Sequence, residues 1–125
     1  MPGEPAVWWA VTIDCNEPYV LAGFWSHVLA TAVIEVGSDR PGWVRLQPLA
    51  PHGPFLNFQP VPERKVGKVR LHLDVLVDDL HAGVERVAAL GGTDTGMRED
   101  LPRGRIAVML DPEGNEFCVL APPTS

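Results

Sequence analysis

Hydrophobic and polar residues alternate along residues 69–77, and this pattern predicts a β-strand. Aliphatic side chains occupy every second position from Leu71 to Val77, and His72 and Asp74 occupy positions between them. Because successive side chains of a strand point to opposite faces, His72 and Asp74 are expected on the face away from these aliphatic residues. The pattern therefore predicts one apolar face and one face on which a histidine and a carboxylate lie together.

Each half of the chain shows the same order of elements: a strand, an amphipathic helix and further strands. Helices are predicted where apolar residues recur every three or four positions, and Gly91-Gly92 ends the second helix. In the first half the expected strands are Trp8–Cys15, Trp43–Gln47 and Phe55–Gln59, with a helix over Pro18–Leu29. In the second half the expected strands are Val69–Val77, Arg105–Leu110 and Glu116–Leu120, with a helix over Leu80–Leu90.

Length and composition favour a single domain built from these two halves. With 125 residues, 46% of them hydrophobic, the chain can form one compact core and is too short for two ordinary domains. Proline and glycine are concentrated between the expected elements. We therefore expect one domain over residues 1–125, with a first module at about 7–60, a linker at 61–68 and a second module at about 69–121.

The charge of the chain argues against nucleic acid as a partner. The formal net charge is −6, and the dense basic stretch at residues 64–70 is interpreted as a solvated linker, because a nucleic-acid surface needs clustered Lys and Arg. The sequence shows no secretory signal and no apolar run of membrane-spanning length. Cys15 and Cys118 lack metal-knuckle spacing and are expected as reduced thiols. These features predict a cytoplasmic protein without a membrane partner.

Three phrases of the sequence resemble the vicinal-oxygen-chelate superfamily, in particular its glyoxalase-like domains of the actinobacterial type. The phrases are the segment from Thr12 to Trp25, the strand containing His72-Leu73-Asp74, and the turn Asp111-Pro112-Glu113-Gly114-Asn115. The superfamily includes glyoxalase I, extradiol dioxygenases and bleomycin-resistance proteins. The resemblance implies an α+β fold in which two β-α-β-β-β modules form a cupped, eight-stranded mixed sheet with helices outside. It also implies a homodimer.

The same resemblance implies where a metal site would lie. Enzymes of the family hold a divalent metal in the cup with His, Gln or Glu side chains from the first and last strand of each module. His72 matches one such position, whereas Ala10 and Cys118 stand at two others and Asn57 or Gln59 stands at the fourth. Metal-dependent lyase or dioxygenase chemistry is therefore disfavoured, and no cofactor is expected. His72 with a Cys118 thiolate still offers a weak site for a soft divalent ion.

A cup without a full metal site favours a small-molecule-binding protein. We expect it to sequester a hydrophobic or aromatic metabolite or antibiotic, as drug-sequestering relatives of the family do. Trp9 and Trp25 are expected in the core. The candidate ligand-binding residues, for which plain packing is the competing explanation, are Trp8, Ala10, Thr12, Trp43, Arg45, Phe55, Asn57, Gln59, His72, Met109 and Cys118.

An enzyme that needs no metal is the alternative prediction. His72 is the candidate base and Asp74 the residue that orients it, which suits isomerase, epimerase or lyase chemistry on a small carbonyl compound. The competing explanation is a polar pair in which each group satisfies the other. A third prediction is a protein whose cup is filled and whose surfaces mediate association.

Overall fold

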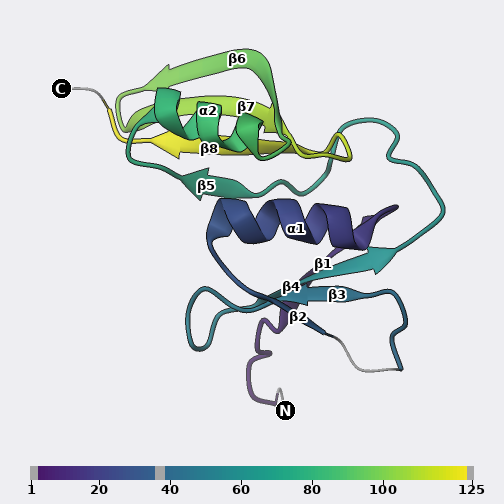
Figure 1. Cartoon of the computed structure of the whole chain (residues 1–125). Helices are drawn as coiled ribbons and strands as arrows, with labels where there is room; N and C mark the ends of the chain where they lie inside the picture. The colour runs from purple at the N-terminus through teal and green to yellow at the C-terminus, as the bar shows by residue number, and fades with distance from the viewer. Residues whose placement is uncertain (1–2, 36–38, 124–125) are drawn as a thin grey trace. The chain divides into compact units, whose positions relative to one another are not determined.

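The computed structural model describes residues 3–35 and 39–123 (Figure 1). The chain forms two compact units, Met1–Pro62 and Glu63–Ser125, and the boundary between them falls in the expected linker at 61–68. Each unit contains one strand, one helix and three further strands, in that order. The eight strands form two four-stranded mixed sheets. The predicted α+β class and the β-α-β-β-β order are therefore confirmed.

In the first unit a parallel pair of strands lies at one edge of the sheet. The elements are β1 (Ala10–Cys15), α1 (Pro18–Leu29), β2 (Val33–Glu35), β3 (Val44–Leu46) and β4 (Phe55–Pro60). The strand order is β1-β4-β3-β2, in which β1 is parallel to β4 and the other neighbours are antiparallel. Parallel strands need a crossover connection, and α1 is part of the connection from β1 to β4.

The second unit has the same topology. Its elements are β5 (Asp74–Leu76), α2 (Leu80–Ala89), β6 (Thr93–Leu101), β7 (Gly104–Leu110) and β8 (Glu116–Ala121). The strand order is β5-β8-β7-β6, and β5 is parallel to β8. Figure 1 shows α2 lying against β7 and β8. The repeat seen in the sequence is thus a repeat of architecture.

Local sequence signals explain where the helices begin and end. Pro18 opens α1, where a first-turn residue needs no N–H partner within the helix. Asp79 caps α2 by accepting the backbone N–H of Ala82 at 2.8 Å. Gly91 has a φ of 119°, which favours glycine just beyond the end of α2. Neither described helix is long and apolar enough to cross a membrane.

The core of each unit lies between its helix and one face of its sheet. In the first unit Trp25 of α1 is 1% exposed, and α1 packs against β3 and β4, whose Val44, Leu46 and Phe58 are equally inaccessible. Residues at the intervening positions of these strands point to the opposite face. We call this opposite side the helix-free face of the first sheet.

In the second unit the buried side chains of β7 and β8 also lie toward the helix. Met109, Phe117 and Val119 are at most 1% exposed, and α2 contributes Val87 to the same core. Met109 pairs with Phe117 across the two strands. The residues that alternate with these make up the helix-free face of the second sheet.

Strands β2 and β6 were not predicted from the sequence, and β5 is much shorter than predicted. β2 has only three residues. In β6 every residue except Leu101 is exposed, so no alternation of apolar and polar side chains marks it. The strand expected over Val69–Val77 begins only at Asp74, where the register with β8 starts. Edge strands with little buried surface leave a weak hydrophobic pattern.

Candidate functional site

Alternate residues of β1, β4 and β3 gather on the helix-free face of the first sheet. The register places Thr12 beside Asn57, and Asn57 beside Arg45. The Nε–H of Arg45 donates to Asn57 Oδ1 at 2.7 Å, and Nδ2 of Asn57 donates to Thr12 Oγ1 at 3.4 Å. Asn57 is only 4% exposed. A chain of polar contacts therefore crosses three strands, with the buried Asn57 at its centre.

Phe55 adds an aromatic surface to this cluster. The guanidinium carbon of Arg45 lies 4.4 Å from the centroid of the Phe55 ring. The ring centroids of Phe55 and Trp9 are 5.0 Å apart, with an angle of 61° between the ring planes. Six of the candidate ligand-binding residues share this face: Ala10, Thr12, Arg45, Phe55, Asn57 and Gln59.

The tryptophans differ in part from the prediction. Trp25 lies in the core as expected, but Trp9 is 63% exposed, so its assignment to the core is wrong. The reason is that β1 begins at Ala10, and the alternation of the strand does not extend back to Trp9. Within residues 3–35 and 39–123, no hydrogen bond or ring contact joins Trp8 or Trp43 to the cluster. The Trp43 ring is instead covered by a neighbouring arginine, 4.6 Å from its centroid.

A second polar cluster lies in the second unit and consists of His72, Asp74 and Cys118. Nδ1 of His72 is 3.0 Å from Oδ1 of Asp74. The parallel pairing of β5 with β8 sets Asp74 directly beside Cys118. Although His72 precedes β5 rather than lying in it, one ligand atom from each residue falls within 4.8 Å of the others. The histidine and the aspartate side chains are 44% and 54% exposed.

The surroundings of Cys118 keep its side chain in the thiol form. Burial raises the pKa of the Cys118 thiol, and the negative charge and hydrogen bonding of Asp74 raise it further. Lys68 acts in the opposite direction with a smaller effect. Since the thiolate is the nucleophile and the metal ligand, Cys118 is a weak nucleophile at neutral pH and must lose its proton to bind a metal.

These three side chains fit a divalent metal by the chemistry of their donors. Imidazole nitrogen, carboxylate oxygen and thiolate sulfur are all ligands of Zn²⁺, and a bound Zn²⁺ supplies Lewis-acid chemistry. The sequence pointed to His72 and Cys118 as metal ligands, and the structure adds Asp74 as a third donor. The matching positions of the first unit contribute little, because Ala10 has no donor and Asn57 Oδ1 accepts from Arg45. The donor set thus comes from the second unit.

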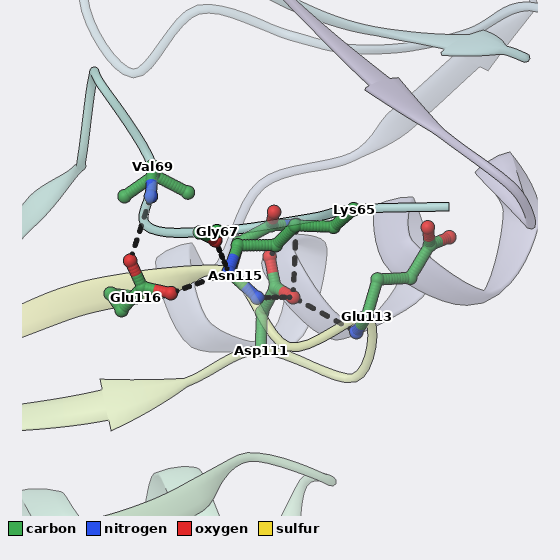
Figure 2. Close-up of polar contacts among 7 residues, drawn as sticks. All are labelled: Lys65, Gly67, Val69, Asp111, Glu113, Asn115 and Glu116. Atoms are coloured by element: carbon green, nitrogen blue, oxygen red, sulfur yellow. Dashed lines mark hydrogen bonds and ion pairs between the residues drawn. The ribbon is translucent and has the colours of Figure 1, made fainter. Parts of the chain in front are cut away.

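The turn before β8 is held by the Asp111 side chain (Figure 2). Its Oδ1 accepts the backbone N–H groups of Glu113 and Asn115 at 2.9 and 3.0 Å, and its Oδ2 accepts Nδ2 of Asn115 at 2.9 Å. Gly114, in the same turn, has a φ of 82°, which glycine adopts without strain. This turn starts β8 at a defined position and thereby sets where Cys118 lies.

Glu116 ties the segment that leads to His72 onto the start of β8 (Figure 2). One carboxylate oxygen accepts the backbone N–H of Val69 at 2.8 Å, and the other pairs with Nζ of Lys65 at 2.6 Å. The hydrogen bond with Lys65 lowers the pKa of the Glu116 carboxyl. Because Val69 stands only three positions before His72, this anchor limits the freedom of the histidine segment.

An apolar hollow of about 240 Å³ lies next to the second cluster on the same helix-free face. The register aligns Leu76, Leu120 and Ile106 across β5, β8 and β7, one row further along than Asp74 and Cys118. The full lining is Leu76, Leu101, Arg103, Gly104, Arg105, Ile106, Leu120, Ala121, Pro122 and Pro123. None of these residues was predicted to bind a ligand, although the two-residue period of a strand already places Leu76 with Asp74 and Leu120 with Cys118.

Met109 was expected in a ligand pocket, and the structure contradicts this prediction. It is fully buried on the face of β7 that packs toward α2, in register with Phe117. The side chains of Met109 and Val108 point to opposite faces of β7, and Val108 pairs with Cys118 on the helix-free face. The role of Met109 is therefore in the core.

The chain belongs to a known family. Residues 10–120 match the family described as "Glyoxalase-like domain". The superfamily predicted from the sequence, that of glyoxalases, bleomycin-resistance proteins and dioxygenases, is thereby confirmed. No curated protein matches the sequence.

Solved structures of this superfamily share the fold at low sequence identity. A glyoxalase/bleomycin resistance protein/dioxygenase family enzyme from Burkholderia phytofirmans PsJN has a TM-score of 0.74 at 20% identity, covering 94% of this chain and 100% of its own. A glyoxalase-related enzyme from Fulvimarina pelagi has a TM-score of 0.68 at 17% identity, covering 92% and 87%. TnmS3, an antibiotic-binding protein from Streptomyces sp. CB03234, has a TM-score of 0.64 at 17% identity, covering 98% and 100%. The neighbours thus include both enzymes and a binding protein.

Proposed function

We propose that this protein is a small-molecule-binding protein that sequesters a hydrophobic or aromatic metabolite or antibiotic. The observation that carries the proposal is the row of Leu76, Leu120 and Ile106 on the helix-free face of the second sheet. This row lines part of an apolar hollow, whereas Met109, Phe117 and Val119 on the other face of β7 and β8 fill the core. The antibiotic-binding protein TnmS3 has a similar fold, which supports the same class of function.

The size and lining of the hollow indicate what it takes. Its volume of about 240 Å³ lies just below the roughly 300–1,000 Å³ of usual small-molecule sites. It therefore suits a single ring or a short aliphatic portion of a ligand. Leu76 is 78% exposed, so a ligand that covers it removes apolar surface from water. Covering most of one leucine contributes about 1–2 kcal/mol to binding.

Titration with N-phenyl-1-naphthylamine, an uncharged aromatic probe that fluoresces in apolar surroundings, tests this proposal. We expect saturable binding to the wild type and binding about five- to thirtyfold weaker to Leu76→Asn, from a loss of about 1–2 kcal/mol. Leu71→Asn is the matched control, because Leu71 is also exposed, at 65%, and does not line the hollow. Absence of saturable binding, or equal weakening by both substitutions, would contradict the proposal.

A second candidate function is metal-independent acid-base catalysis, and the 3.0 Å contact between His72 and Asp74 favours it. Asp74 orients the imidazole, whose other nitrogen is left to exchange a proton with a small carbonyl compound. His72→Ala should reduce turnover by about 10²–10⁴-fold without loss of folding. His81→Ala is the control, because His81 also contacts a carboxylate, at 3.1 Å, on the exposed surface of α2. Retained turnover in His72→Ala would exclude this function.

We also propose that the protein is a homodimer and that it is cytoplasmic. A binding protein built from paired modules is expected to dimerise as its family commonly does. Sedimentation that shows only the 13.6 kDa monomer at working concentration would contradict the homodimer.

A further inference from the structure

An arginine, Arg45 of β3, lies on the helix-free face of the first sheet. Arg45 is half-buried, and its Nε–H is used by Asn57. Among the side chains that the structure describes, those of residues 3–34 and 39–123, no carboxylate pairs with its guanidinium. The terminal nitrogens therefore retain N–H donors with no acceptor among those residues. A sheltered cation of this kind is stabilised when an anion supplies the acceptor oxygens.

The neighbours of Arg45 hold its side chain in one orientation. Arginine can only donate hydrogen bonds, so the amide oxygen of Asn57 must face it, and the amide nitrogen must face Thr12. The Phe55 ring supports the guanidinium from one side, 4.4 Å from its carbon. A fork held by contacts on two sides loses little side-chain entropy when it binds a ligand.

The surface beside this fork is aromatic. Trp9 contacts Phe55 edge to face, and its carbonyl accepts the Phe55 backbone N–H at 2.9 Å, which fixes Trp9 next to β4. Trp9 is nonetheless 63% exposed, so most of its indole is available for stacking. The net charge of −6 gives the whole protein no general attraction for anions. Recognition of an anion therefore depends on this local arrangement.

We propose that Arg45, oriented by Asn57 and Phe55, binds the carboxylate of a planar aromatic acid whose ring stacks on Trp9. A carboxylate matches the planar guanidinium fork with two parallel hydrogen bonds. This inference rests on the proposed function, because it names the chemical class of the small molecule that the protein binds. It concerns the first unit and does not depend on the hollow of the second.

Calorimetric titration with 2-naphthoate and with its neutral counterpart 2-naphthamide tests the inference. We expect naphthoate to bind the wild type at least about tenfold more tightly than naphthamide, since charge-assisted hydrogen bonds are the stronger ones. Arg45→Met should abolish this preference, and Arg45→Lys should retain part of it, because lysine keeps the charge but not the fork. Arg40→Met is the matched control, because Arg40 also lies over an aromatic ring, at 4.6 Å from Trp43.

Nuclear magnetic resonance locates the ligand. Addition of naphthoate should shift the indole N–H signal of Trp9 and the Nε–H signal of Arg45 in the wild type. Equal affinities for acid and amide, a preference that survives in Arg45→Met, or an equal loss in Arg40→Met would overturn the inference. A failure of naphthoate to bind the wild type would overturn it as well. In each case the uncharged naphthylamine probe reports separately on the proposed function, because its expected site is in the second unit.

Discussion

Phenylalanine occurs twice in β4, on opposite faces of the strand, and the pair tests which face of the first sheet is the core. Phe58 is 0% exposed and lies in register with Ile13 and Val44, on the side that packs on α1. Phe55 is three positions earlier and half-buried on the helix-free face. The same substitution at the two positions should therefore have different costs.

The magnitudes follow from the surroundings of each ring. Truncation of the fully buried Phe58 to alanine removes the transfer free energy of the ring and leaves a cavity, which together cost about 3–5 kcal/mol. Phe55→Ala loses part of its burial, one edge-to-face contact and one cation–π contact, together about 1–2 kcal/mol. For a chain of this length the difference corresponds to a gap of roughly 10 °C in Tm.

Urea unfolding followed by circular dichroism measures both free energies of unfolding, and an unchanged m-value confirms that only stability has changed. The loss in Phe58→Ala is a large part of the free energy of unfolding of a small domain. Phe58→Leu should therefore also be measured, and its free energy of unfolding is expected to fall by about 1–2 kcal/mol. Equal losses in Phe55→Ala and Phe58→Ala would refute the assignment of faces. The placement of Arg45 on the helix-free face would then fail as well.

Three further predictions concern single carboxylates. Asp74→Asn removes the negative charge beside Cys118 and should lower the pKa of the Cys118 thiol. In a variant without the other cysteine, alkylation of Cys118 by iodoacetamide at pH 7 should therefore become faster. An unchanged rate of alkylation would contradict the effect of Asp74. Hydrogen bonding to Arg98 lowers the pKa of Asp94 to about 2, so this pair stabilises the folded state above the unfolded pKa of about 4 and loses its effect as the pH falls toward 2. Asp94→Asn should accordingly destabilise the protein by about 0.5–1 kcal/mol at pH 7 and hardly at pH 2, and a difference independent of pH in urea titrations would exclude this account. Glu116→Gln weakens the ion pair with Lys65 of the linker and should speed hydrogen exchange of the Val69 backbone amide that Glu116 binds, at least about threefold, with no comparable change at the capped start of α2.

Much of the fold could be predicted from local patterns. The bounds of α1 match the prediction, because Pro18 and an apolar stripe mark it without any distant contact. Asp79 caps α2, and an aspartate immediately before an apolar stripe is itself a local signal of a helix start. β2 and β6 could not be located, since short or exposed edge strands bury too few side chains to leave a periodic pattern.

The candidate sites were only partly predictable. The spacing of His72 and Asp74 indicated their shared face, and their side chains do contact each other. Cys118 joins them only because β8 pairs with β5 in one particular register. Met109 was misplaced because a one-residue difference in strand phase exchanges the two faces of a strand.

The sequence by itself therefore determined the repeated order of strand, helix and further strands, the ends of the helices and the family, because each depends on residues close together in the chain. Tertiary structure alone decided which distant residues meet. Thr12 and Asn57 are 45 positions apart, yet strand pairing brings them together and places Arg45 alongside. Such contacts depend on register and on the packing of each helix against its sheet. Since a shift of one residue in register moves every side chain to the other face, composition and periodicity could not specify them.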